Sequence, residues 1–401
     1  MAKIVMLSDS PTLTTGYGRV MQVLAPAFHE LGHAVTVIGW GYTGEPHDFP
    51  FPIIPCNAHA DRFGEDILGE FIRYEKPDIL FTLGDPWMTE FIPEMEERVA
   101  VHWVSYFPLD GYPIPKSWHG WLLNIDTPIV FSKFAQNLAE EVLGRKPPLI
   151  YHGVDTNKFQ VLDRSTCKQE ILGFDDKFIV GTVARNQPRK NLPALVRAFA
   201  DFARGKDDVA LYMHTQIRDV GWNIDELVER FELYDKAYCT DNFNALKGVP
   251  DSELNKLYSM FDLFALPTMS EGFGLPILEA QACGTPVLVT DFSACPELVV
   301  NRNQLIKVKD TIIMGRNIEQ AIVDHDDMVR KLNYYYADWK KTRAGIMGAN
   351  SVLKAYGVAG RRLAESFDWS IQLKEFNKML RQITPQAERR SKAIFPQFHK
   401  I

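Results

Sequence analysis

Short apolar runs alternate with helical patterns from the first residues of the chain. The run 4–7 is followed by a polar loop over 8–18, by apolar residues at helical spacing over 20–31, and by a second apolar run at 34–38. Continuous short apolar runs are typical of strands buried on both faces of a parallel sheet. A strand–loop–helix–strand unit of this kind is the building block of a doubly wound sheet. We therefore expect an α/β fold with parallel sheets.

The pattern continues and then restarts in the second half of the chain. At 401 residues the chain exceeds the roughly 250–300 residues at which single cores stop growing, so two domains are expected. Residues from about 315 to 385 show only helical patterns. Further strands are expected at 78–82, 100–104 and 128–132 in the first half and at 178–184, 209–214, 263–267 and 286–290 in the second.

Composition narrows the class of protein. Hydrophobic residues make up 46% and charged residues 24%, and the formal net charge is -7. The acidic balance disfavours a general nucleic-acid binder, although it leaves room for a local basic groove. The N-terminal apolar run is too short for a signal peptide, and no stretch reaches the ~20 apolar residues of a membrane span. The five cysteines form no CxxC pair, which disfavours a zinc site and suits a reducing compartment, so a cytoplasmic protein is expected.

The densest group of chemically informative residues follows the expected strand at 263–267. Gly272 and Gly274 permit close approach of a ligand to the backbone, and the helix expected after them offers amides that favour a phosphate. Glu279, one turn into that helix, can accept hydrogen bonds from a ribose, and Glu271 can accept them from a sugar. A turn with two solvated glutamates is the alternative. The position at the carboxyl edge of a parallel strand, where open α/β sheets bind ligands, favours a nucleotide-sugar site.

The segment from Glu271 to Glu279 resembles the E-x7-E signature of retaining glycosyltransferases of family 4. The resemblance extends from residue 3 to about 380, and it implies the GT-B fold, in which two Rossmann-like doubly wound domains face each other across a cleft. Other segments match the family in the same order: Gly16 with Gly18, Leu31–Val37, His152–Asp155 with Phe159, Arg185 with Lys190–Asn191, and Gly248–Leu254.

The resemblance also sets the expected domain boundaries. It implies an acceptor-side domain over 1–160 and a nucleotide-sugar-binding domain over 161–366. A final helix over 367–385 would cross back to the first domain and leave a tail at 386–401. The tail carries Arg389, Arg390 and Lys392, and the sequence leaves open whether it docks on the protein, is disordered, or contacts an anionic membrane surface.

The family resemblance assigns roles to several residues. Arg185 and Lys190 would bind the donor diphosphate and stabilise its charge as the glycosyl bond breaks, whereas the role of Arg189 is open. Gly16 would let the first loop approach the donor phosphate or the acceptor, unless it simply provides a flexible turn. The rest of the expected donor contact is the segment Gly272, Phe273, Gly274 and Leu275.

One departure from the family concerns a histidine that many members carry near the reacting sugar. Here the region 104–113 contains no histidine, and Asp110 is the candidate for the equivalent place. Its carboxylate would orient a sugar hydroxyl or help to accept a proton, and a turn before Gly111 is the competing explanation. His152 is an open case between a site residue and a structural one.

The resemblance implies a mechanism but no acceptor. We expect front-face substitution with retention, in which the leaving phosphate helps to deprotonate the hydroxyl acceptor, and we expect neither a metal nor another cofactor. The donor is a UDP-, GDP- or ADP-linked hexose in this hypothesis. A non-catalytic nucleotide-sugar-binding protein, or an epimerase or phosphorylase of the same fold, is the alternative. The first half also contains a group of aromatic residues for which two roles are open, stacking on sugar rings or packing in the core. They are Trp103, Tyr106, Phe107, Tyr112, Trp118 and Trp121.

Overall fold

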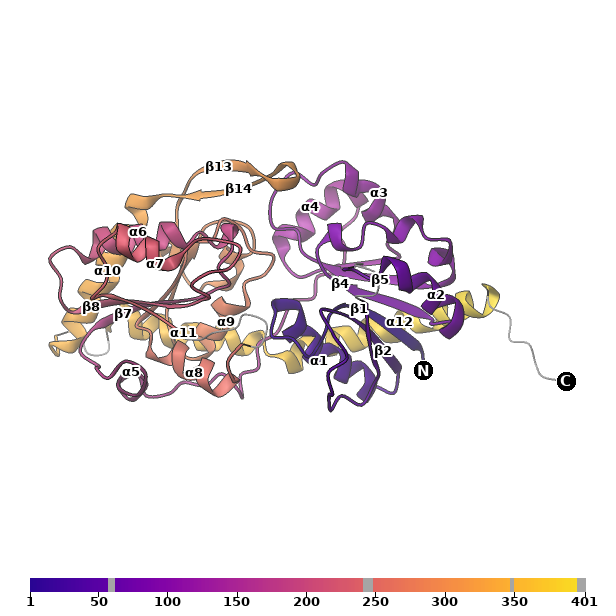
Figure 1. Cartoon of the computed structure of the whole chain (residues 1–401), viewed down its shortest axis with the longest axis horizontal. Helices are drawn as coiled ribbons and strands as arrows, with labels where there is room; N and C mark the ends of the chain where they lie inside the picture. Colours follow the sequence, from indigo (N-terminus) through magenta and orange to yellow (C-terminus); the bar gives the residue numbers. More distant parts are fainter. Residues whose placement is uncertain (57–61, 241–247, 347–349, 395–401) are drawn as a thin grey trace. The chain divides into compact units, whose positions relative to one another are not determined.

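The computed structural model describes residues 1–56, 62–240, 248–346 and 350–394. The chain divides into two compact units (Figure 1). Unit 1 comprises Met1–His152 and Trp369–Ile401, and unit 2 comprises Gly153–Asp368. The boundaries therefore fall at 152/153 and 368/369, compared with 160/161 and 366/367 in the sequence interpretation.

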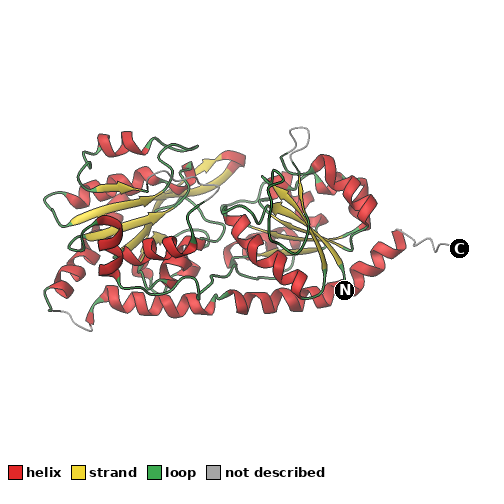
Figure 2. Ribbon diagram, turned by 60° about the horizontal axis from the view of Figure 1, so that its bottom comes forward, coloured by secondary structure: helices red, strands yellow, loops and turns green. Residues whose placement is uncertain are grey.

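Unit 1 is built on a parallel sheet in the order β3-β2-β1-β4-β5-β6, with helices on both sides of it (Figure 2). Its strands are β1 (Lys3–Asp9), β2 (Ala34–Trp40), β3 (Ile53–Pro55), β4 (Ile79–Leu83), β5 (His102–Phe107) and β6 (Thr127–Val130). Its helices are α1 (Gly16–Glu30), α2 (Glu65–Glu75), α3 (Ser117–Asn124), α4 (Lys133–Leu143) and α12 (Trp369–Ile394).

Unit 2 repeats the topology, with the order β12-β11-β10-β7-β8-β9. Its strands are β7 (Phe178–Val183), β8 (Val209–His214), β9 (Ala237–Cys239), β10 (Leu263–Leu266), β11 (Val287–Thr290) and β12 (Leu305–Ile306). Its helices are α5 (Arg164–Leu172), α6 (Leu192–Ala203), α7 (Ile224–Arg230), α8 (Asp251–Met260), α9 (Leu275–Ala282), α10 (His325–Arg343) and α11 (Val352–Ser366).

Both sheets reverse their strand order at one point. In unit 1 the first strand β1 lies between β2 and β4, and in unit 2 the first strand β7 lies between β8 and β10. Loops leave in opposite directions where the order reverses, and ligands of doubly wound sheets bind beside the carboxyl ends of the strands there. The loops after β1 and β4, and those after β7 and β10, are therefore the places to look for a site.

The core of unit 1 accounts for the aromatic residues that the sequence left open. Trp103, Tyr106, Phe107, Trp118 and Trp121 are all buried, whereas the remaining member of the group, Tyr112, is 36% exposed. The five buried members therefore pack in the core of unit 1.

Helix α12 belongs to the same core. The ring of its Phe376 packs against Tyr106, Phe81 and Phe28, with centroid distances of 5.1, 6.3 and 6.0 Å. Residues from the two ends of the chain are thereby joined in one hydrophobic core.

A hairpin in unit 2 contradicts the expectation of helix alone after residue 315. Strands β13 (Val308–Met314) and β14 (Ile318–Val323) pair antiparallel, so residues 318–323 form a strand. The amide of Ala321 in β14 donates to the carbonyl of Met269, over a distance of 2.9 Å. A backbone hydrogen bond between residues distant in the sequence therefore helps to hold this hairpin. The local spacing of apolar residues does not reveal such a bond.

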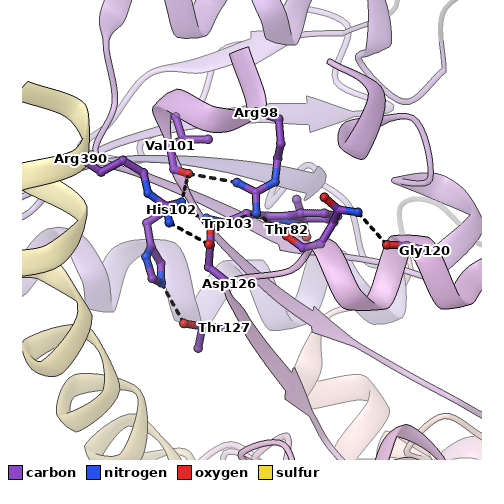
Figure 3. Close-up of polar contacts among 10 residues, drawn as sticks. Thr82, Arg98, Val101, His102, Trp103, Gly120, Asp126, Thr127 and Arg390 are labelled. Atoms are coloured by element: carbon purple, nitrogen blue, oxygen red, sulfur yellow. Dashed lines mark hydrogen bonds and ion pairs between the residues drawn. The ribbon is translucent and has the colours of Figure 1, made fainter. Parts of the chain in front are cut away.

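The end of the chain also differs from the expected tail at 386–401. Residues 386–394 continue α12, and residues 395–401 lie outside the described part. Arg390 of this extension donates from both terminal nitrogens to Asp126, over 2.7 and 2.9 Å, and to the carbonyl of Val101 over 2.9 Å (Figure 3). Arg98 also pairs with Asp126, at 2.9 Å. The described part of the tail is therefore docked on unit 1.

Replacing Arg390 with Met should destabilise the protein by about 1–3 kcal/mol, because three charge-assisted hydrogen bonds are lost while the apolar stem remains. The neighbouring Arg389 is exposed, so Arg389→Met serves as the matched control and should change the stability by less than about 0.5 kcal/mol. Urea unfolding of the three proteins measures the difference. Equal stabilities for the two variants would show that the docked end contributes nothing.

Two general properties follow from the described residues. None of their helices combines the length and the apolar character that crossing a membrane requires. Within the same residues, no group of three or more His, Cys, Asp and Glu side chains has the geometry to hold a metal ion.

Candidate functional site

Two loops of unit 2 meet where its strand order reverses. The loop after β7 contains a 3-10 turn, Pro188–Lys190, followed by Asn191 in the left-handed region at φ 53°. The loop after β10 runs through residues 267–274. The carbonyl of Arg189 accepts hydrogen bonds from Thr268 Oγ1 (2.9 Å) and from the amide of Met269 (2.7 Å). These bonds tie the cationic loop to the loop that carries Glu271.

Glu271 is the centre of the charge cluster in this site. Its Oε1 accepts from Lys190 Nζ at 2.5 Å, and its Oε2 accepts from Arg189 NH1 at 3.1 Å. The side chains of Lys190 and Glu271 are only 9% and 5% exposed, whereas that of Arg189 is 34% exposed. The amide of Glu271 donates to Ser293 Oγ at 2.9 Å. Hydrogen bonds thus hold both the backbone amide and the carboxylate oxygens of Glu271.

The electrostatics of this cluster favour a carboxylate at Glu271. Burial raises the pKa of Glu271, but the charges of Lys190 and Arg189 and their hydrogen bonds outweigh burial and lower it. Burial and the nearby charge of Arg189 lower the pKa of Lys190, and Glu271 opposes that shift. The cluster has two cationic groups against one carboxylate, so it carries an excess of positive charge that suits an anionic ligand.

Helix α9 begins directly after the Glu271 loop. Gly274 caps it with φ 106°, and a Cβ added there would lie 2.8 Å from Ile277 Cδ1, so the position requires glycine. The first amides of a helix have no acceptor within the helix and form, with the helix dipole, a site for phosphate. Beside Gly274 in this loop, Gly272 and Leu275 are partly exposed and Phe273 is buried. In α9, Pro276 has no amide hydrogen and the amide of Ile277 donates to the carbonyl of Gly274 over 2.9 Å, so this helix start offers mainly the positive end of its dipole.

Glu279 lies in the second turn of α9 and is 5% exposed. Its Oε2 accepts a hydrogen bond of 2.7 Å from the phenol of Tyr258 in α8. This bond holds the Glu279 carboxylate in place. The second acidic residue of the signature is thus buried and held by Tyr258, and its role toward a ribose stays a prediction.

Arg185 forms an ion pair with Asp219. Its guanidinium donates to both oxygens of Asp219, from Nε over 2.7 Å and from NH2 over 3.2 Å, and its side chain is 47% exposed. Arg189, whose role the sequence left open, is the arginine that contacts Glu271. Lys190 and Glu271, by contrast, are brought together as expected.

The remaining expected site residues belong to unit 1. Gly16 is the first residue of α1, and a Cβ added there would meet no atom within 4 Å. At Gly18 a Cβ would lie 2.5 Å from the carbonyl oxygen of Leu13, so Gly18 is the glycine that this loop requires. Asp110 lies three residues beyond the end of β5 and is partly exposed.

His152, the open case, has a structural role. It is 3% exposed, stacks on Phe131 with ring centroids 4.0 Å apart, and its Nδ1 lies 2.8 Å from the Tyr106 phenol oxygen. The phenol donates its single proton to the carbonyl of Ile150, so His152 donates through Nδ1. Burial lowers the pKa of His152 to about 3. The imidazole is therefore neutral and serves the core of unit 1.

Two further residues support the site and were absent from the sequence interpretation. Ser293 holds the backbone of Glu271, and Tyr258 holds the carboxylate of Glu279. Both lie far from their partners in the sequence. Neither belongs to a motif with its own spacing, so local sequence patterns contained no signal for them.

Comparison with known proteins now places the site in a family. Residues 163–343, which include both loops and α9, match the family described as glycosyl transferases group 1. Unit 2 carries a domain of this glycosyltransferase family. The resemblance drawn from the Glu271–Glu279 segment is thereby confirmed.

Relatives of this glycosyltransferase domain agree with the family match. The D-inositol 3-phosphate glycosyltransferase of Segniliparus rotundus is 29% identical over 226 residues, which cover 56% of this chain and 44% of that protein. The chain spans less than half of the length of the curated relatives that it matches first.

Solved structures extend the likeness to both units. Sucrose-phosphate synthase from Thermosynechococcus elongatus has a TM-score of 0.73 at 16% identity, covering 96% of this chain and 100% of that one. Anabaena HepE in complex with UDP-glucose has a TM-score of 0.67 at 16% identity, covering 95% of this chain and 100% of that one. At these identities the likeness concerns the fold, and it confirms the expected GT-B class with its two Rossmann-like units.

Proposed function

We propose that the protein transfers a glycosyl group from a nucleoside-diphosphate sugar to a hydroxyl acceptor. The observation that carries this proposal is the Lys190–Glu271–Arg189 cluster beside the start of α9, at the strand reversal of a glycosyltransferase domain. A fixed pair of cations next to the positive end of a helix dipole suits a diphosphate, and the family match supports the sugar transfer.

In this proposal the cluster stabilises the leaving group. Negative charge develops on the diphosphate as the glycosyl bond breaks, and cations already held in place need no reorganisation to stabilise it. Glu271 holds Lys190 and Arg189 in position and accepts hydrogen bonds from the donor sugar. Glu279 accepts from the ribose. Arg185 contributes to diphosphate binding from the exposed edge of the same loop.

The reaction course is part of the proposal. We infer front-face substitution with retention, in which the leaving phosphate takes the proton of the incoming hydroxyl. The protein cations supply the charge that a metal supplies in other transferases, so the proposed reaction needs no metal. Asp110 and Gly16, on unit 1, would act on the acceptor side.

Thermal unfolding with UDP-, GDP- and ADP-sugars tests donor binding directly, because a ligand that binds only the folded protein raises Tm. The matching donor should stabilise the protein, and mass spectrometry with a panel of hydroxyl acceptors should show a product heavier by one sugar. If none of the donors raises Tm, the donor site is wrong. Binding of a donor without any product would instead favour the nucleotide-sugar-binding alternative.

The substitution Glu279→Gln should weaken donor binding about tenfold, which corresponds to about 1.4 kcal/mol, because a neutral amide accepts hydroxyl hydrogen bonds less strongly than a carboxylate. The exposed Glu253 on α8 provides the matched control Glu253→Gln. Isothermal titration of donor into each variant measures the change. Equal donor affinity in the two variants would remove Glu279 from the site.

A further inference from the structure

Unit 1 repeats the topology that positions the donor site of unit 2. Its strand order reverses between β1 and β4, so the loops after these strands occupy the place that the Lys190 and Glu271 loops occupy in unit 2. The first loop begins at Ser10, and the second contains Asp85 and the 3-10 turn Pro86–Met88. Ligands of doubly wound sheets bind at this point, which makes the carboxyl edge of unit 1 a candidate site in its own right.

An aromatic group lies at this edge, separate from the aromatic core. Trp40 ends β2, Trp87 follows β4, and Phe63 joins them: the Trp40–Phe63 and Phe63–Trp87 ring centroids are 5.4 and 5.3 Å apart, both edge to face. Trp40 Nε1 donates to the carbonyl of Phe63 at 3.0 Å. We call Trp40, Phe63 and Trp87 the edge aromatics.

The edge aromatics differ in burial. Trp40 is 3% exposed, and a Cβ added at Gly84 would lie 2.7 Å from its ring, so glycine at the end of β4 is what allows Trp40 to lie there. Phe63 and Trp87 are partly exposed. Trp40 therefore forms a buried support, and the two partly exposed rings offer apolar surface at the carboxyl edge.

The charge around this edge is acidic. Four partly exposed carboxylates lie at the ends of strands that are neighbours in the sheet: Asp9 ends β1, and Glu45, Asp85 and Asp110 follow β2, β4 and β5. Hydrogen bonds from Thr12 and Thr43 outweigh burial and lower the pKa of Glu45 to about 2, so this group is ionised. Arg62 lies over the Phe63 ring at 5.6 Å as a counter-charge.

This combination selects among acceptor classes. An anionic acceptor, such as a nucleic acid or a phosphorylated sugar, would meet several carboxylates at the edge and be repelled. A neutral saccharide presents an apolar ring face, which suits the flat face of an aromatic side chain, and hydroxyl groups, which donate to carboxylates. The carboxyl edge of unit 1 carries both partly exposed aromatic rings and partly exposed carboxylates.

We propose that the carboxyl edge of unit 1 binds a neutral saccharide, with the sugar ring on Trp87 and its hydroxyls on neighbouring carboxylates such as Asp85. The proposal rests on the glycosyltransferase function above and names the chemical class of its acceptor. It assigns Trp87 the role of a specificity residue, since the flat indole recognises a sugar ring and not a charged group.

Saturation-transfer NMR on the full chain tests the proposal without turnover. The probes are neutral methyl hexosides and disaccharides, with a short single-stranded oligonucleotide as the anionic alternative. At least one saccharide should receive saturation from the protein, and its affinity should fall about tenfold or more in Trp87→Leu and less in Trp87→Phe, which keeps an aromatic face. The control Tyr74→Leu removes an aromatic ring that is 82% exposed on α2, and it should bind the saccharide like the unaltered protein.

The outcomes separate this proposal from the proposed function. Each variant is also tested for the rise in Tm with the donor sugar, which reports on unit 2 alone and should not change. Saccharide binding that is equal in Trp87→Leu and Tyr74→Leu, preferential binding of the oligonucleotide, or no saccharide binding at all overturns the acceptor proposal while leaving donor binding intact. If Trp87→Leu fails to fold, Trp87→Phe and Asp85→Asn decide, and saccharide binding unaffected by both overturns the proposal.

Discussion

Lys190→Met should lower the rate of sugar transfer by about 10²–10³-fold and should also destabilise the protein by about 3–5 kcal/mol. The loss of rate follows from the proposed function, in which this buried cation stabilises the leaving diphosphate. The loss of stability has a different cause: Glu271 is 5% exposed and would keep its charge with only the more exposed Arg189 as a partner.

A second variant separates these two causes. The double substitution Lys190→Met/Glu271→Leu replaces a buried ion pair with apolar side chains of similar size, a change that is often neutral or stabilising. It should recover most of the stability that Lys190→Met loses and recover none of the rate.

Urea unfolding and the rate of product formation, measured on the same three proteins, test this pattern. A double variant that is stable and transfers sugar at the normal rate would show that the pair serves only the fold. A single variant as stable as the unaltered protein would show that Glu271 does not depend on Lys190.

The sequence revealed most of the fold because the strands of doubly wound sheets are short and uniformly apolar. The runs at 4–7, 34–38 and 209–214 each became a strand of a parallel sheet. The sequence did not predict the hairpin β13–β14, and the reason is physical. Ile318, Ala321 and Ile322 are spaced as on one face of a helix, and the strand is selected by the long-range bond from Ala321 to Met269.

The motif in the sequence pointed to the carboxylates of the candidate site but not to the side chains that contact them. The spacing of Glu271 and Glu279 identified both carboxylates, since the motif spans one loop and one helix start. Which arginine meets Glu271 depends on the turn at Pro188–Lys190, which directs Arg189 to the carboxylate, while Arg185 pairs with Asp219. Contacts between distant segments, such as Ser293 with Glu271, require the folded structure.

The protein should lose stability as the pH falls from about 6.5 to 5, because each unit buries a neutral histidine. Burial lowers the pKa of His152 in unit 1 to about 3 and that of His214 in unit 2 to about 4. The same groups titrate near 6.5 in the unfolded chain. Because the folded pKa is the lower one, the unfolded chain binds protons first, so the stability is fully present above pH 6.5 and is lost as the pH falls toward the folded value.

The expected size is about 1.4 kcal/mol per pH unit for each histidine, or about 2 kcal/mol each at pH 5. His102 and His33, whose pKa values burial also lowers, contribute in the same direction. The carboxylates with lowered pKa values, such as Glu45, act only below about pH 4.5, so the window from 6.5 to 5 isolates the histidines.

Urea unfolding across this window, with His152→Asn and His214→Asn, measures the contribution of each group. An asparagine at 152 can still donate to the Tyr106 phenol, so the variant should fold with lower stability at pH 7.5 and a flatter dependence on pH. His214 Nδ1 lies 2.7 Å from Thr240 Oγ1, a contact that asparagine can also make. A pH dependence as steep in both variants as in the unaltered protein would mean that these imidazoles accept protons in the folded state, and the assignment of both as neutral core groups would then be wrong.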